Sequence, residues 1–352
     1  MKNLEKYRSI LSDEVQGLFL TSRYSRMYAA EFDIAEGYAV VGKNGARYFT
    51  DSRYIESAQK NIKDFEVIDF ARDLYACLNA AIKELGITKL GFEEAYLTVA
   101  EFDTFREKLQ AEFVPCQKQI NAFRASKEPW ELDRMMKAQE ITDRAFTEVC
   151  GRIREGMTEK ELAAELIYCL YKNGGEGLSF DPIVVSGPNT SMPHGVPGDR
   201  KLQKGDFITM DFGVIYQGYC SDMTRTVALG YATEEMKKVY ATVLEAQLAG
   251  ISASRAGVSG KTIDEAARDV IREAGYGEYF GHGYGHSLGL EIHESPNCNL
   301  RNEEPMPLHA VASAEPGIYL PDQFGVRIED VVIFEEDGCR DITKSPKDLL
   351  IL

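Results

Sequence analysis

Residues 208–213 read Ile-Thr-Met-Asp-Phe-Gly, in which apolar side chains alternate with Thr, Asp and Gly. This period of two is typical of a β-strand, whose successive side chains point to opposite faces of a sheet. Asp211 therefore lies in the middle of a strongly apolar strand. A Tyr-Gln-Gly turn at residues 216–218 sends the chain back through residues 221–227. Asp222, on that return strand, can lie across the hairpin from Asp211.

The same arrangement of acidic residues recurs in the second half of the chain. Glu315 lies on one face of an apolar segment, and Arg327 and Glu329 share a face of a strand expected over residues 325–334. The two acids follow the first pair by 104 and 107 residues. This correspondence suggests that two similar halves each contribute two carboxylates.

A repeat of helical segments has nearly the same offset. Residues 144–156 resemble residues 245–257, an offset of 101 residues. Each copy leads into a helix with the spacing of a capping box, which starts at Thr158 in the first copy and at Thr262 in the second. Two similar α/β halves within one domain would explain the repeat. A chance match of two amphipathic helix pairs is the alternative.

Four acids that converge inside apolar strands need compensating positive charge, because buried carboxylates repel one another and are costly to desolvate. Two divalent cations would balance four carboxylates, and a neutral imidazole would complete the ligand set. The alternative is four solvated residues on strand edges. Their duplicated positions within apolar strands weaken that interpretation.

Histidines cluster in one short segment of the second half. His282, His286 and His293 are three of only five histidines in the chain, and glycines surround them. Glycines at this density indicate that the backbone approaches something bound closely. His194, in a Met-Pro-His-Gly segment, is a weaker candidate that could simply occupy a surface turn. His309 has no such context and is interpreted as structural.

Composition excludes several classes of function. The chain has 40 Lys and Arg against 56 Asp and Glu, a formal net charge of −16, so nucleic acid is not expected as a partner. Seven scattered cysteines without a CxxC pair argue against a disulfide framework and against a zinc-thiolate site. No apolar run suits a signal peptide or a membrane span. We therefore expect a cytoplasmic protein without a membrane partner.

Two domains fit a chain of 352 residues. The first part alternates short apolar strands with amphipathic helices, which is typical of a small α/β domain. A long helix is then expected from Pro129 to about Ile153, with Ser126 as its cap and Pro129 in its first turn. We place an amino-terminal α/β domain at residues 1–125 and a second domain at residues 126–352.

These features together resemble the pita-bread metallopeptidases, the family of Xaa-Pro aminopeptidase, prolidase and methionine aminopeptidase. The motifs that carry the resemblance are TDSRY at residues 50–54, MDFG at 210–213, SDMTRT at 221–226, the segment 282–294, EPGIY at 315–319 and RIED at 327–330. The resemblance covers essentially the whole chain. It implies an α/β (α+β) pita-bread catalytic domain with an internal pseudo-two-fold duplication, preceded by a smaller α/β domain of the creatinase and prolidase type.

The resemblance also implies a dinuclear metal site. Its five ligands would be Asp211, Asp222, His286, Glu315 and Glu329, in agreement with the spacing of the carboxylates. Two divalent ions are expected, Mn²⁺ above all, with Co²⁺ or Zn²⁺ as alternatives, because four oxygen ligands and one nitrogen favour hard ions.

Further residues would act on the substrate. Glu315 is the expected proton shuttle. By resemblance, His293 would donate to the carbonyl oxygen, and His194 would contact the residue after the scissile bond. His282, with nearby aromatic residues such as Tyr284, would line a proline pocket.

Arg327 shares a strand face with Glu329. It could orient that metal ligand, bind substrate or form only a supporting salt bridge.

Four functions remain open at this point. The first is an aminopeptidase that releases the residue before a proline at position two of a peptide, and the second is a prolidase restricted to Xaa-Pro dipeptides. A methionine aminopeptidase is disfavoured by the extra amino-terminal domain. A non-catalytic peptide-binding module is disfavoured by the complete ligand set. By resemblance to the proline-specific branch, we also expect a homodimer in which the amino-terminal domain of one subunit walls the active site of the other.

Overall fold

The computed structural model describes residues 3–71 and 73–352. It divides the chain into two compact units, Met1–Arg124 and Ala125–Leu352, which are called the amino-terminal and carboxyl-terminal units below. Within the described residues, no helix is both long enough and apolar enough to pass through a membrane.

The amino-terminal unit alternates strands and helices along most of its length. Its elements are α1 (Asn3–Arg8), β1 (Gly17–Leu20), α2 (Arg23–Ala30), β2 (Tyr38–Gly42), β3 (Gly45–Thr50), α3 (Ile55–Asn61), β4 (Glu66–Asp69), α4 (Leu74–Glu84), β5 (Lys89–Phe92), α5 (Val99–Lys108), β6 (Glu112–Pro115) and α6 (Gln117–Ala125). The six strands form one mixed sheet in the order β4-β3-β2-β1-β5-β6. On one face of it, Val40 and Phe49 pack with Leu78 of α4 and Phe105 of α5.

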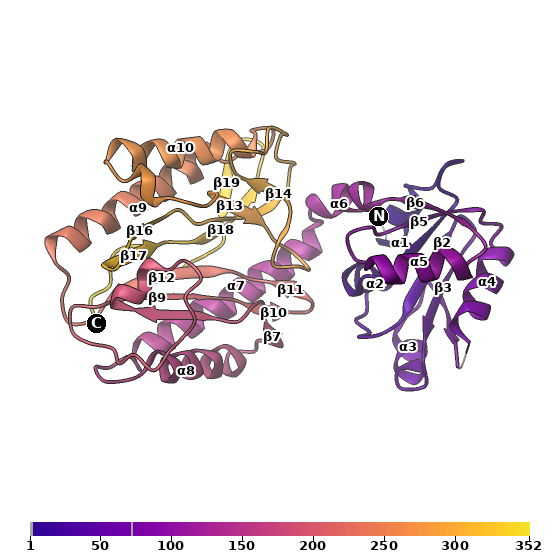
Figure 1. The fold of residues 1–352 in the computed structure, drawn as a ribbon, viewed down its shortest axis with the longest axis horizontal. Helices are drawn as coiled ribbons and strands as arrows, with labels where there is room; N and C mark the ends of the chain where they lie inside the picture. The colour runs from indigo at the N-terminus through magenta and orange to yellow at the C-terminus, as the bar shows by residue number, and fades with distance from the viewer. Residues whose placement is uncertain (1–2, 72) are drawn as a thin grey trace. The chain divides into compact units, whose positions relative to one another are not determined.

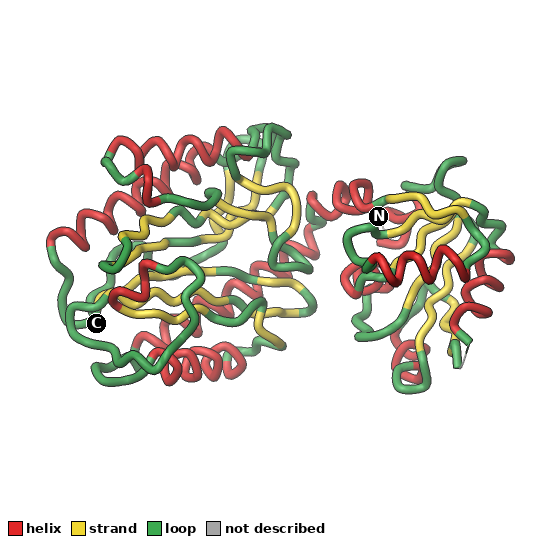
Figure 2. The backbone as a smooth tube through the Cα atoms, viewed as in Figure 1, coloured by secondary structure: helices red, strands yellow, loops and turns green. Residues whose placement is uncertain are grey.

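The carboxyl-terminal unit contains two helix pairs and several short sheets (Figures 1 and 2). Its elements are α7 (Pro129–Cys150), α8 (Glu159–Lys172), β7 (Gly177–Leu178), β8 (Ile183–Ser186), η1 (Gly187–Ser191), β9 (Phe207–Phe212), β10 (Val214–Tyr216), β11 (Tyr219–Cys220), β12 (Met223–Ala228), α9 (Glu234–Ala253), α10 (Gly260–Glu273), η2 (Gly277–Tyr279), β13 (Gly285–Ser287), β14 (Glu294–Cys298), β15 (Val311–Ala314), β16 (Gly317–Leu320), β17 (Phe324–Arg327), β18 (Asp330–Phe334) and β19 (Cys339–Asp341).

Each helix pair covers the apolar face of one sheet. Ile208, Met210 and Phe212 of β9 pack with α7 and α8, under the sheet β12-β9-β8. Ala312 and Ala314 of β15 pack with α9 and α10, under the sheet β14-β13-β15-β18-β19. Figure 1 shows α8 and α10 on opposite sides of the strands. The polar faces of both sheets are thereby left for the site between the helix layers.

The expected internal duplication is visible in the backbone. Gly156 and Gly257 both have positive φ, +87° and +83°, in the turns that connect the two helices of each pair. Thr158 then bridges Lys201, and Ser259 bridges Pro305, at the corresponding points of the two halves. The fold is the pita-bread arrangement that the family resemblance implied.

Two expected helix caps are wrong. α7 begins after Glu128 and ends at Cys150, and the Ser126 hydroxyl donates instead to the carbonyl of Leu308 at 2.7 Å. α10 is capped by Ser259, whose hydroxyl accepts from the backbone N–H of Thr262. Thr262 thus lies inside the first turn, because the residue equivalent to the cap Thr158 is Ser259.

The strand expected over residues 325–334 is interrupted. β17 ends at Arg327 and pairs with β16, whereas β18 begins at Asp330 and pairs with β15. The chain changes sheets at residues 328–329, where the backbone N–H of Glu329 donates to the carbonyl of Thr224 at 3.1 Å. This break places Glu329 against the strand β12 of the first half.

Candidate metal centre

The five expected metal ligands all lie on strands or directly at strand ends. Asp211 is on β9 and His286 on β13, Asp222 directly precedes β12, Glu315 directly follows β15, and Glu329 directly precedes β18. All five line one cavity of about 640 Å³. The two halves of the duplicated fold therefore meet at a single acidic site.

Three of the five side chains form a compact group. Single ligand atoms of Asp222, His286 and Glu329 lie within 4.8 Å of one another. His286 Nε2 is 3.5 Å from Asp222 Oδ2 and 3.3 Å from Glu315 Oε1. Asp222 does not lie directly opposite Asp211 in the hairpin. Asp211 is paired with Thr224, and Asp222 lies just outside the paired residues of β9 and β12.

Burial and mutual repulsion dominate the electrostatics of the site. Burial, followed by the charges of Asp211 and Glu315, raises the pKa of Asp222 well above its usual range. Burial, followed by the charges of Asp222 and Glu315, does the same to the pKa of Glu329. Burial also raises the pKa of Glu315. Burial and mutual repulsion thus favour the protonated forms of these carboxyl groups when no positive charge is added.

The site fits a divalent cation on two further grounds. Asp211 Oδ1 and Asp222 Oδ1 are buried and have no hydrogen-bond partner among the described residues. Orphaned carboxylate oxygens are costly, and metal ligation satisfies them. Burial lowers the pKa of His286, so its ring is held in the neutral form that ligates metals. Oxygen ligands with one imidazole suit ions such as Mn²⁺ or Zn²⁺.

Hydrogen bonds orient two of the carboxylates. Thr224 Oγ1 donates to Glu329 Oε2 at 2.6 Å, and Ser313 Oγ donates to Glu315 Oε1 at 3.0 Å. These hydroxyls occupy the polar faces of β12 and β15, and Thr224 lies two residues after Asp222. Each hydroxyl residue lies two positions from an acid in the sequence, Thr224 from Asp222 and Ser313 from Glu315. This spacing on one strand face could have identified both hydroxyls as part of the site.

The three other expected histidines also line the cavity. His293 is exposed and packs edge-on against His286, with 4.3 Å between ring centroids. Partial burial and the neighbouring His286 lower the pKa of His293. His282 Nε2 lies 2.9 Å from the hydroxyl of Tyr319, and His194 is exposed in the loop after η1.

Tyr284 does not line the cavity, in contrast to the expectation. It is buried in the core against Gly250 of α9, where its hydroxyl donates to the carbonyl of Gln247 at 2.8 Å. The aromatic residue beside His282 on the cavity wall is Tyr319, which the sequence showed only as part of the EPGIY motif.

Arg327 contacts a different acid from the one expected. Its Nη2 donates to Asp211 Oδ2 at 2.6 Å, its Nε donates to Thr224 Oγ1 at 3.0 Å, and its Nη1 donates to the Tyr319 hydroxyl at 2.9 Å. Its side chain is 4% exposed. Arg327 therefore orients Asp211, because the strand break at residues 328–329 separates it from Glu329.

A buried ion pair supports the histidine segment. Lys127 Nζ lies 2.8 Å from Glu294 Oε2, and the side chains are 2% and 6% exposed. Glu294 Oε1 accepts from the backbone N–H groups of Leu290 and Glu291. These bonds fix the turn that precedes His293. Sequence patterns do not predict this pair, since its partners are 167 residues apart.

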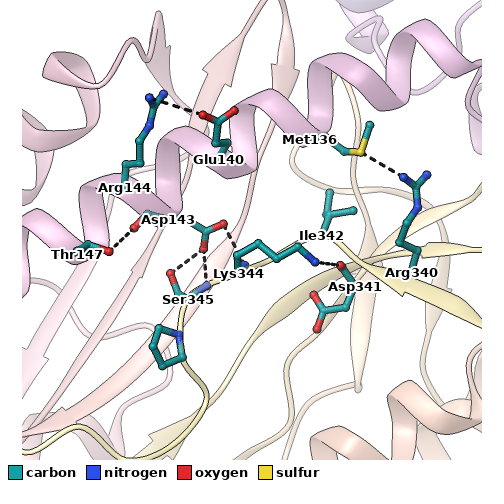
Figure 3. Close-up of a pocket in the computed structure, with 11 residues that line it drawn as sticks. Met136, Glu140, Asp143, Arg144, Thr147, Arg340, Asp341, Ile342, Lys344 and Ser345 are labelled. Atoms are coloured by element: carbon teal, nitrogen blue, oxygen red, sulfur yellow. Dashed lines mark hydrogen bonds and ion pairs between the residues drawn. The ribbon is translucent and has the colours of Figure 1, made fainter.

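A second cavity, of about 450 Å³, lies between α7 and the segment that follows β19 (Figure 3). There Asp143 accepts from the backbone N–H groups of Lys344 and Ser345, at 3.0 and 2.8 Å. Its described lining shares no residue with the cavity of the metal ligands. These contacts fasten the end of the chain to α7.

Comparison with known proteins agrees with this geometry. The family described as metallopeptidase family M24 matches residues 133–336, more than half of the chain. The chain belongs to this family. The Creatinase/Prolidase N-terminal domain matches residues 4–126 of the same M24 metallopeptidase. The matched family implies divalent metal ions, and the ligand group described above is where this chain could hold them.

Individual relatives of this M24 metallopeptidase carry different names. It is 38% identical to an uncharacterized peptidase of Bacillus subtilis, over 99% of both chains. A structure named Xaa-Pro dipeptidase from Bacillus anthracis has a TM-score of 0.96 and 41% identity. The match spans 100% of this chain and 99% of the Bacillus anthracis chain. A structure named X-Pro aminopeptidase from Thermotoga maritima has a TM-score of 0.94 and 37% identity, with both chains fully covered.

Proposed function

We propose that this M24 metallopeptidase is an Xaa-Pro aminopeptidase, which removes the residue before a proline at position two of a peptide. It would hold two divalent ions, Mn²⁺ in the first place, through Asp211, Asp222, His286, Glu315 and Glu329. The observation that carries the proposal is the convergence of these five side chains on one cavity that three further histidines also line.

The metal ions would supply a polarised scissile carbonyl and a water molecule whose pKa is lowered to near neutral. Glu315 accepts from Ser313 and faces His286, so its carboxylate is held at the cavity wall. From there it can take a proton from the attacking water and pass it to the leaving nitrogen. His293, exposed to the cavity beside His286, can donate to the carbonyl oxygen as charge develops there.

Recognition of proline would use the wall formed by His282 and Tyr319. The proline nitrogen has no N–H and the ring fixes φ near −65°, so the pocket has to accept an apolar ring without offering it a hydrogen-bond acceptor. His282 Nε2 and the Tyr319 hydroxyl already bond to each other at 2.9 Å. Their ring faces can therefore contact proline without leaving a polar group unpaired. His194, on the loop after η1, would contact the residue that follows the scissile bond.

Matched tripeptides test the proposal. With the Mn²⁺-loaded enzyme, we expect kcat/KM for Ala-Pro-Ala to exceed that for Ala-Ala-Ala by at least about 100-fold, the scale of a well-built specificity pocket. Equal values would reassign the chain to a general metalloaminopeptidase. No hydrolysis of either tripeptide or of Ala-Pro by a preparation with bound metal would favour a peptide-binding module.

A prolidase restricted to dipeptides is the second candidate, and the name of the Bacillus anthracis structure favours it. Hydrolysis of Ala-Pro but not of Ala-Pro-Ala would establish it. The homodimer stays part of the proposal, and sedimentation of the active enzyme at assay concentration tests it. A fully active monomer would remove it.

A further inference from the structure

One neutral side chain on the cavity wall has a buried acceptor that no other described residue satisfies. Asn297 lies on β14, and its Oδ1 has no hydrogen-bond partner among the described residues. Its neighbour Cys298 packs into the core with α10, so the alternation of the strand turns Asn297 to the opposite face, where it lines the metal cavity. An unsatisfied buried polar group of this kind points to a missing partner.

Asn297 belongs to the side of the cavity assigned to proline. The next lining residue along the chain, Asn299, lies directly beside Gly283, since a Cβ on that glycine would fall 2.8 Å from Asn299 Cβ. Gly283 in turn follows His282 of the proposed proline pocket. In the proposed substrate orientation, the chain that continues beyond proline would leave along Asn297 and Asn299.

The charges on this wall disfavour a carboxylate at that point. Arg327 is the only lysine or arginine among the described residues that line the cavity, and each of its side-chain nitrogens already donates to a protein oxygen. Asp181 adds a further negative charge at the rim. A dipeptide such as Ala-Pro would bring its carboxylate against neutral amides, and an unpaired charge in a partly buried site is costly.

We propose that Asn297 binds the peptide unit that follows proline, so that the enzyme selects substrates with an amide at this point over dipeptides with a free proline carboxylate. A carboxamide offers one donor end and one acceptor end, which rotation about χ2 can exchange, and it can pair with the N–H and C=O of a peptide unit. The proline nitrogen has no N–H, so the first N–H beyond the scissile bond belongs to the group attached to the proline carbonyl. This inference rests on the proposed Xaa-Pro activity.

Three substrates separate charge from length. Ala-Pro ends in a carboxylate, Ala-Pro-NH₂ replaces it by a neutral amide of nearly the same size, and Ala-Pro-Ala continues the chain. With the metal-loaded wild-type enzyme, we expect both substrates with an amide after proline to exceed Ala-Pro by at least 10-fold in kcat/KM, mainly through a lower KM. Equal or faster hydrolysis of Ala-Pro would overturn the inference and leave the Xaa-Pro function intact. Failure to cleave all three would overturn both.

Variants at Asn297 test the residue itself. Asn297→Arg should raise the ratio of kcat/KM for Ala-Pro to kcat/KM for Ala-Pro-NH₂ by about 10-fold. Asn297→Leu should lower kcat/KM for Ala-Pro-NH₂ and leave kcat/KM for Ala-Pro almost unchanged. Gln203→Arg, at an exposed position before β9 and outside the cavity lining, adds the same charge and should change neither ratio. Unchanged ratios in both folded Asn297 variants would overturn the assignment. The wild-type comparison decides the preference even if a variant fails to fold.

Discussion

Arg327 and Asp211 form a buried ion pair across the two halves of the carboxyl-terminal unit, with 2.6 Å between Nη2 and Oδ2. Arg327 ends β17 of the second half, and Asp211 lies on β9 of the first. The guanidinium fixes one oxygen of this carboxylate and leaves the other, Oδ1, without a partner. The ion pair thus leaves Oδ1 as the oxygen that Asp211 would offer to the proposed metal site.

Replacement of this arginine separates charge from geometry. Arg327→Lys keeps the charge but cannot donate to Asp211, Thr224 and Tyr319 at once, because an ammonium lacks the planar fork of a guanidinium. We expect kcat/KM on Ala-Pro-Ala to fall at least 10-fold, with reduced metal affinity in a titration followed by calorimetry. Arg340→Lys, at an exposed site, is the matched control. Unchanged metal affinity and activity would exclude the positioning role.

Chelation should abolish peptidase activity, since the site has no other group able to polarise the scissile carbonyl as strongly. Dialysis against EDTA followed by readdition of Mn²⁺ or Co²⁺ should restore it, and metal analysis should give two ions per chain. Full turnover by a verified metal-free preparation would refute the metal mechanism. One tightly bound ion in the fully active enzyme would refute the dinuclear site alone.

Asp222→Asn and Glu329→Gln should each lower kcat by orders of magnitude, because each removes one ligand charge. In the metal-free state, the same changes should leave the protein as stable or more stable, since they relieve repulsion among buried carboxyl groups. Asp337→Asn, in an exposed turn, should alter neither property. Thermal unfolding and steady-state kinetics measure both effects, and near-normal turnover in either variant would show that the site is misplaced.

The stability of the metal-free protein should decrease as the pH rises. The pKa values of Asp222 and Glu329 are raised in the folded protein, whereas in the unfolded chain they lie near their usual values of about 4. The folded state therefore binds these protons more tightly, and the stability that they contribute is present below about pH 4 and lost as the pH rises through the folded-state pKa values.

Urea unfolding of EDTA-treated protein between pH 5 and pH 8 measures this loss, and Asp222→Asn should flatten the slope. Added Mn²⁺ should raise the midpoint of thermal unfolding more at pH 8 than at pH 5.5, since metal and protons compete for the same oxygens. A pH-independent stability of the metal-free wild type would contradict the prediction.

Lys127→Met should destabilise the protein by about 3–5 kcal/mol, the usual cost of removing one partner from a buried ion pair. Glu294 would lose its cation while it still holds the turn before His293, so activity should fall as well. Lys137→Met, on the exposed face of α7, is the control. Denaturant unfolding gives the free energy, and a loss below about 1 kcal/mol would show that the pair is weak.

The sequence revealed those features of the site that depend on short-range periodicity. The alternation around Asp211 identified the strand, its apolar face and the turn at residues 216–218, where Gln217 and Gly218 have the positive φ of a tight hairpin. The offset of about 100 residues between the halves identified the duplication and hence the position of Glu315.

Features that depend on long-range packing were not accessible from the sequence. In the sequence, the break between β17 and β18 looks like a continuous strand, because most of residues 325–334 are apolar. Only the different pairing partners of the two strands show that Arg327 and Glu329 belong to separate sheets. Tyr284 is turned into the core by the space above Gly250, which is 34 residues earlier in the chain. Local patterns carry no information on such partners.

The division of the proposed ligands between the two halves would also govern when the protein can become active during its synthesis. Asp211 and Asp222 leave the ribosome first, but the side chains that complete the cluster follow only with His286, Glu315 and Glu329. A nascent chain that ends before residue 327 lacks both the last carboxylate and the arginine that contacts Asp211. The growing polypeptide thus carries no assembled protease centre until nearly the whole carboxyl-terminal unit has emerged.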